Sequence, residues 1–107
     1  PEFRRRMRAA PWHGEDISGK TILLWAEQGL GDAIHFVRYA PRVAECGARV
    51  VVEAPQALHG LFATVEGVSK VVKRGYSEPH DAHAALMSLP TILASRKEPG
   101  PIYRPRR

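Results

Sequence analysis

An aspartate that directly follows a glycine-rich turn is the residue of this chain best placed to do chemistry. Asp32 follows Gly29-Leu30-Gly31, and an apolar run, Thr21–Ala26, precedes that turn. Glycine allows positive φ angles and lets another molecule approach the backbone closely. A carboxylate at the mouth of a cleft can take a proton from an acceptor hydroxyl, whereas an aspartate at a helix start often only caps free N–H groups. The two roles are compatible, and both place Asp32 at the start of a helix.

Several other polar or flexible residues are candidates for substrate binding. His35 lies one helical turn beyond Asp32 and can hydrogen-bond a sugar or a phosphate, although a surface histidine without a ligand fits the position as well. Arg38 can pair with a phosphate or form an ion pair on the helix surface. Ser88 is also expected to cap a short helix. The predicted substrate-binding residues are Gln28, Gly29, Gly31, His35, Arg38 and Ser88.

The two glycines are also compatible with a dinucleotide-binding turn. Gly29-Leu30-Gly31 matches the start of a GxGxxG motif, and Glu53 stands near the end of the next apolar run, where a ribose-binding acid would lie. However, Ile34 occupies the third glycine position, and the negative charge of Asp32 would repel a pyrophosphate. We therefore expect neither NAD nor FAD, and no other bound cofactor.

Metal binding and disulfide formation are not expected. His80, Asp81 and His83 have metal-binding side chains, but no matching pair with zinc spacing occurs elsewhere in the sequence. Cys46 is the one cysteine, so no internal disulfide can form, in agreement with a reducing compartment. No apolar run approaches the ~20 residues of a membrane-spanning helix. We therefore expect a cytoplasmic protein without a metal. Trp12 and Trp25 are expected to be packing residues.

The net charge of +5 comes from the two ends of the chain. Most of the lysines and arginines lie before residue 9 or after residue 95, whereas acidic residues outnumber basic ones between these positions. A nucleic-acid-binding domain more often carries its basic residues on the folded surface, with aromatic residues among them. Nucleic acid is therefore not an expected partner.

The elements that must position these residues alternate between strands and helices. Apolar and β-branched runs predict strands over residues 21–26, 49–53, 68–73 and 81–86. Helices are expected from Asp32 toward Cys46 with a kink or restart at Pro41, over residues 55–66, and after Ser88. Gly47 and Gly67 are expected to end the first two helices.

This alternation predicts an α/β fold with right-handed crossovers between parallel strands. We expect a Rossmann-like three-layer α/β/α domain with a mostly parallel four-stranded sheet in the order 3-2-1-4. That order brings the turn at residues 27–32 next to residues 86–90, at a topological switch. The folded domain is expected over residues 17–94, with a basic linker or remnant of a preceding region at 1–16 and a disordered basic tail at 95–107.

Four stretches of the sequence share their pattern with a known family: Pro11–Asp32, Phe36–Pro41, Gly47–Val50 and Leu86–Pro90. They resemble the glycosyltransferase-like region of bacterial tetratricopeptide-repeat proteins, over Pro11 to Leu93. More distantly, Gly31-Asp32 with His35 is similar to the N-terminal motif of the lipopolysaccharide heptosyltransferases.

The resemblance implies one half of a GT-B fold, in which two Rossmann-like domains face each other across a cleft. Asp32 would then deprotonate a sugar or protein acceptor, and a nucleotide-sugar donor would bind mostly to the C-terminal half. The resemblance further implies a missing C-terminal domain and missing N-terminal tetratricopeptide repeats, so the fragment would be inactive alone. An exposed cleft face would favour self-association into a homo-oligomer. The alternative is a non-catalytic Rossmann-like module for interaction or nucleotide binding.

Overall fold

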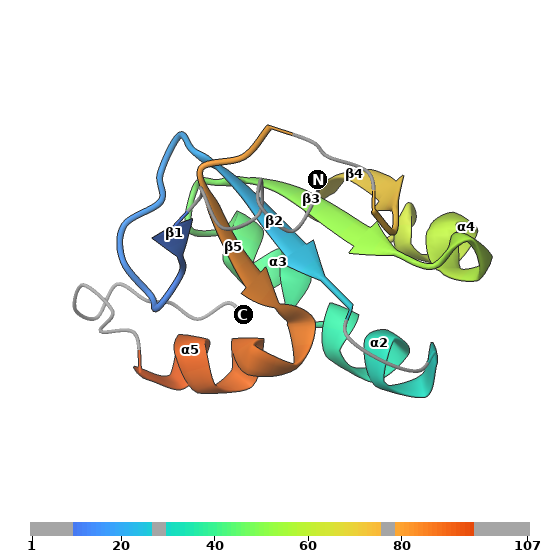
Figure 1. The fold of residues 1–107 in the computed structure, drawn as a ribbon. Coiled ribbons are helices and arrows are strands. Elements are labelled where there is room, and N and C mark those ends of the chain that lie inside the picture. Colours follow the sequence, from blue (N-terminus) through green and yellow to red (C-terminus); the bar gives the residue numbers. More distant parts are fainter. Residues whose placement is uncertain (1–9, 27–29, 76–78, 96–107) are drawn as a thin grey trace.

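A parallel sheet forms the centre of the molecule (Figure 1). The computed structural model describes residues 10–26, 30–75 and 79–95 of the chain. Within these ranges the sheet has five strands, all parallel to their neighbours, in the order β1-β5-β2-β3-β4. The strands are β1 (Ala10–Pro11), β2 (Thr21–Trp25), β3 (Arg49–Ala54), β4 (Val68–Lys73) and β5 (Ala82–Ala85).

The predicted α/β class with a parallel sheet is confirmed, and the sheet is consistent with a Rossmann-like fold, but the predicted strand count was wrong and the complete order differs by one added strand. The four strands expected in the order 3-2-1-4 correspond to β4-β3-β2-β5, and β1 adds a fifth strand at the edge beyond β5. The backbone N–H of Trp12 donates to the carbonyl of His83 at 2.9 Å and extends this pairing. Pro11 lacks an N–H, which an edge strand tolerates because one side of it has no partner strand.

The segment before residue 17 was predicted to be a basic linker or the remnant of a preceding region, but residues 10–16 belong to the fold. The side chain of Trp12 is only 2% exposed and joins the main hydrophobic cluster. Its indole Nε1 donates to the carbonyl of Glu15 at 2.8 Å, which satisfies the one polar atom of the ring. Residues 10–16 therefore anchor the edge of the sheet instead of linking it loosely to another region.

The helices are short and follow the strands. They are α2 (Leu30–Val37), α3 (Ala40–Ala44), the 3₁₀ turn η1 (Gln56–Leu58), α4 (His59–Phe62), the 3₁₀ turn η2 (Leu86–Ser88) and α5 (Leu89–Ser95). The restart predicted at Pro41 is confirmed, because Pro41 lies in the first turn of α3. The helix predicted over residues 55–66 was too long. Its last residues form turns closed by i→i+3 bonds, such as that from Thr64 N–H to the carbonyl of Leu61 at 3.1 Å.

Alternate residues of the strands divide the core into two clusters. The larger cluster covers one face of the sheet, where Ile22 and Leu24 of β2 are fully buried beside Val50 and Val52 of β3. Every described helix and 3₁₀ turn contributes its buried side chains to this cluster. The smaller cluster comprises Leu23, Val51 and Val72 on the other face. The helical layer on the first face is thus present, and the second helical layer of the predicted three-layer domain stays a prediction.

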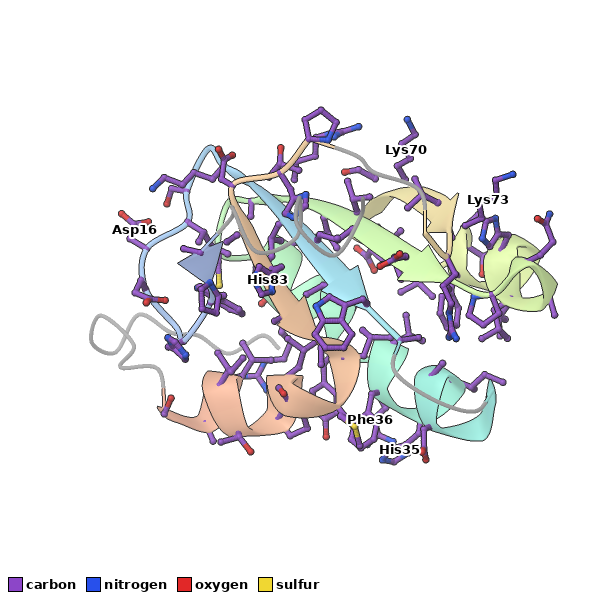
Figure 2. All side chains as sticks on the ribbon, viewed as in Figure 1. Asp16, His35, Phe36, Lys70, Lys73 and His83 are labelled. Carbon is purple, nitrogen blue, oxygen red and sulfur yellow. The ribbon has the colours of Figure 1, made fainter. Side chains whose placement is uncertain are left out.

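Among the described strands, β4 forms one edge of the sheet, and it carries lysines. Lys70 and Lys73 of β4 are exposed, and Figure 2 shows both side chains extending away from the strand. Charged side chains on an edge strand disfavour pairing with the edge of another sheet. Any self-association of this domain should therefore use a different surface.

The turn before β4 offers a test of the packing between α3 and this edge. Gly67→Ala is expected to destabilise the domain by about 1–3 kcal/mol. Gly67 has φ of +92°, and a Cβ added there would lie 2.9 Å from the Cβ of Ala44. The change should appear as a lower midpoint in urea denaturation followed by circular dichroism.

Gly60→Ala is the matched control, because Gly60 lies in α4 and a Cβ there would meet nothing within 4 Å. Alanine favours the helix, so this variant is expected to match the parent or to exceed it by up to about 1 kcal/mol. Equal stability of the two variants would contradict the described packing of Gly67.

Candidate functional site

The carboxyl ends of β2 and β5 define a topological switch. β2 pairs with β3 on one side and with β5 on the other, yet the chain visits β3 and β4 before it returns to β5. Helix α2 leaves the end of β2 and contacts η2, which leaves the end of β5 (Figure 1). The predicted approach concerned residues 27–32, of which 27–29 lie outside the described residues, and the structure shows the contact of α2 as a whole with η2. Ligands of open parallel sheets commonly bind at such a switch.

Asp32 lies in the first turn of α2, and its side chain is exposed. In the same helix, Ala33 and Val37 are buried in the main hydrophobic cluster. Ala33 and Val37 are one helical turn apart, so they lie on the side of α2 that packs on the core. Asp32 lies outside the core. The carboxylate is therefore accessible from solvent, as a general base for a bound hydroxyl must be, and it also lies at the helix N-terminus, where a negative charge is stabilising.

His35 and Arg38 are exposed and contact aromatic rings of their own segment. The ring of His35 meets Phe36 edge-on, with centroids 4.7 Å apart. Figure 2 shows His35 on the side of α2 that faces away from the sheet, whereas Phe36 is half-buried and packs against the main hydrophobic cluster. The guanidinium carbon of Arg38 lies 5.5 Å from the ring centroid of Tyr39. Both polar side chains are therefore within reach of a ligand that approaches α2 from solvent.

The predicted glycine turn lies only partly in the described structure. Gln28 and Gly29 fall outside the described residues. Gly31 lies within α2, where its φ is not positive and an added Cβ would meet nothing within 4 Å. A positive φ angle is therefore not the reason for glycine at position 31, and the close approach of a ligand to this backbone stays a prediction.

Ser88 is exposed at the end of η2, directly before α5, and it lines a hollow of about 510 Å³. The hollow lies at the carboxyl ends of three neighbouring strands, β1, β5 and β2. Its wall includes Trp12, Trp25, His83, Met87 and Thr91. Asp32, His35 and Arg38 are not among the lining residues, so the structure divides the predicted site between α2 and this hollow.

Sequence reasoning missed the hollow because it treated Trp12 and Trp25 as packing residues only. That interpretation fits the buried Trp12, but Trp25 is only half-buried at the end of β2. The two residues come together because β5 inserts between β1 and β2. A half-buried tryptophan at the last position of a predicted parallel strand was the available signal.

Glu53, the candidate ribose-binding acid, has a structural role. Its side chain is only 3% exposed, and its Oε2 accepts the backbone N–H of Gly75 at 2.8 Å. Beside it, Nη2 of Arg74 donates to the carbonyl of Ala26 at 3.2 Å. These two hydrogen bonds hold the segment after β4 against the ends of β3 and β2. The structural role of Glu53 therefore argues against the dinucleotide hypothesis, which requires this residue to bind a ribose.

The candidate metal-binding residues do not converge. Oδ2 of Asp81 accepts the backbone N–H of Thr21 at 2.9 Å, while the rings of His80 and His83 lie 6.4 Å apart and nearly perpendicular. Over residues 10–26, 30–75 and 79–95, no three histidine, cysteine or acidic side chains are grouped so that they could hold a metal ion. Asp81 instead helps to fix the start of β2.

Comparison of this chain with protein-family models, curated proteins and solved structures gives no match. The resemblance to a glycosyltransferase-like region therefore stays a prediction from the residues quoted above. Among the helices that the structure describes, none has both the length and the apolar character needed to cross a membrane.

The buried carboxylate of Glu53 provides a second test. Glu53→Ala is expected to lower the free energy of unfolding by about 1–3 kcal/mol, because the N–H of Gly75 loses its acceptor in a buried place. Glu66→Ala removes an exposed glutamate and is expected to change stability by less than about 0.5 kcal/mol. Chemical denaturation of both variants checks this, and a Glu53 variant as stable as the Glu66 variant would refute the structural role.

Proposed function

We propose that this chain is the acceptor-side domain of a GT-B glycosyltransferase and that Asp32 is its general base. The observation that carries the proposal is the place of Asp32, an exposed carboxylate in the first turn of α2. Helix α2 follows β2 along the chain and contacts η2, which follows β5, and ligands of open parallel sheets commonly bind at such an edge. A base at this edge is accessible to a hydroxyl of a bound acceptor.

In the proposed reaction, the acceptor hydroxyl gives its proton to Asp32 while its oxygen attacks the anomeric carbon of the donor sugar. The bond between that carbon and the nucleotide breaks, and the nucleoside diphosphate leaves with the bonding electrons. His35 and Ser88 have hydrogen-bonding groups suited to sugar hydroxyls. Arg38 carries a positive charge suited to the diphosphate of a nucleotide-sugar donor.

Two exposed apolar side chains support the proposal that a second domain packs at this edge. Ile34 on α2 is 45% exposed and Met87 on η2 is 44% exposed, and these two elements are in contact. Large apolar side chains gathered on neighbouring elements commonly mark an interface. We propose that a C-terminal Rossmann-like domain covers them in a longer protein, which also carries N-terminal tetratricopeptide repeats. The uncovered edge would allow two copies of this chain to associate.

A non-catalytic interaction module is the second candidate, because Ile34 and Met87 would serve docking without any role for Asp32. A nucleotide-binding module has less support, since Glu53 is engaged with the backbone of Gly75. Either candidate fits the cytoplasm, which the impossibility of an internal disulfide supports.

The proposal is tested in the longer protein that joins this chain to a C-terminal Rossmann-like domain. Asp32→Asn is expected to lower kcat by about 10²–10⁴-fold, the usual contribution of general-base catalysis. KM for the donor should change little, because the donor is proposed to bind the other domain. Release of nucleoside diphosphate from a panel of sugar nucleotides provides the measurement.

Glu45→Gln is the matched control, because it neutralises an exposed carboxylate at the end of α3 and should leave kcat unchanged. An Asp32→Asn enzyme with full activity would exclude Asp32 as the base. Failure of the longer protein to turn over any sugar nucleotide would favour the interaction module.

A further inference from the structure

We infer that the hollow at the carboxyl ends of β1, β5 and β2 binds an uncharged pyranoside. The inference rests on the proposed function only for the role of that sugar, which would be the acceptor. The chemistry of the wall is independent of Asp32, which lies outside the hollow.

The position of the hollow favours a ligand. Three adjacent parallel strands end at it, and the register pairs Pro11 with His83 and Trp25 with Ala85. The gap between β2 and β5 is also the topological switch of the sheet, where ligands of open α/β folds bind. A volume of about 510 Å³ is within the range of small-molecule sites.

The wall of the hollow offers an aromatic surface of the kind that sugars use. His83 pairs in register with Leu23, two residues before Trp25, so His83 and Trp25 lie on the same face of the sheet. Trp25 is half-buried, whereas Trp12 is buried and forms a fixed part of the wall. A pyranose ring presents C–H groups on one face, and these pack favourably against an indole.

Hydroxyl groups from the following helix complete the wall. Ser88 at the end of η2 and Thr91 in α5 are both exposed and line the hollow. Each hydroxyl can donate one hydrogen bond and accept others, as the hydroxyls of a sugar also can. A neutral ring with several hydroxyl groups would therefore satisfy the polar atoms on one side and the aromatic surface on the other.

The charge of the wall argues against a nucleotide. Among the described residues that line the hollow, none is a lysine, arginine, aspartate or glutamate. A phosphate ligand would leave its charge without the cationic partner that such sites commonly supply. The exposed His13 also lines the hollow, and its Nδ1 lies 3.7 Å from the carboxylate of Glu15, which offsets any positive charge on the ring. The wall thus favours an uncharged ligand.

The experiment uses the 107-residue chain and the indole N–H signals of its two tryptophans, both of which line the hollow. Methyl glycosides of glucose, galactose and N-acetylglucosamine are added in separate NMR titrations. At least one is expected to shift an indole signal saturably, with Kd in the millimolar range. Uridine diphosphate at the same concentrations is expected to give no saturable shift of these signals.

Two variants of α5 locate the binding. Thr91→Arg places a long charged side chain in the hollow and is expected to weaken glycoside binding by at least about tenfold, a free-energy change of about 1.4 kcal/mol. Ala94→Arg adds the same side chain at an exposed position of α5 outside the hollow and is expected to bind as the parent does. Retained dispersion of the amide spectrum shows that each variant is folded. Ser88→Arg replaces Thr91→Arg if the latter unfolds.

The inference is overturned if no glycoside gives a saturable shift, or if binding survives both Thr91→Arg and Ser88→Arg. Tighter binding of uridine diphosphate at the indoles would overturn the uncharged class of ligand. Loss of this inference alone would appear as turnover that depends on Asp32 without glycoside binding in the hollow. Loss of the proposed function alone would appear as glycoside binding in the hollow with full activity of Asp32→Asn.

Discussion

The pairing of β2 with both β3 and β5 is the constraint on which the rest of this structure depends. Ile22 of the central strand pairs with Val50 on one side and Ala82 on the other, and all three residues are buried. Parallel neighbours cannot be joined by a tight turn, so each must be reached by a crossover. The chain therefore leaves β2 for β3 and β4 and returns across the sheet to β5. This route brings α2 into contact with η2 at the edge of the sheet where β2 and β5 end.

The return from β4 to β5 is held by polar contacts of backbone groups. Glu53 accepts the N–H of Gly75 where this segment begins, and Asp81 accepts the N–H of Thr21 where it ends. A buried carboxylate is destabilising unless hydrogen bonds replace those it made with water. The hydrogen bond from Gly75 to Glu53 therefore fixes the position of the segment that follows β4. The residue that suggested a ribose in the sequence is thus accounted for by the topology. An acidic residue near the end of a parallel strand can therefore bind the backbone of the connecting segment as well as a ligand.

Much of the strand pattern could be predicted, because β-branched runs such as Arg49–Ala54 and Val68–Lys73 have few alternatives to a buried or edge strand. The restart at Pro41 was predictable for a similarly local reason. Strand β1 was not predictable, because a strand of two residues has no periodicity in its sequence. Its pairing also depends on His83, which lies far along the chain. The hollow depends on the same long-range event. The place of Asp32 in the first turn of a helix was predictable, whereas its relation to the aromatic wall required the order of the strands.

Met87 connects the two parts of the proposed site. It lines the hollow, and it belongs to the turn η2 that contacts α2, the helix that carries Ile34 and Asp32. A domain that packs on Ile34 and Met87 would therefore contact both α2, which carries Asp32, and η2, which lines part of the hollow. Such a cover would exclude water from both, and charge interactions are stronger where water is excluded. Without such a domain, the proposed sugar ring would still contact the indoles of the hollow, while Asp32 is exposed to solvent. Sugar binding and proton transfer would then depend on different parts of the protein. Binding would need only the ends of the three strands, whereas proton transfer would also need the covering domain.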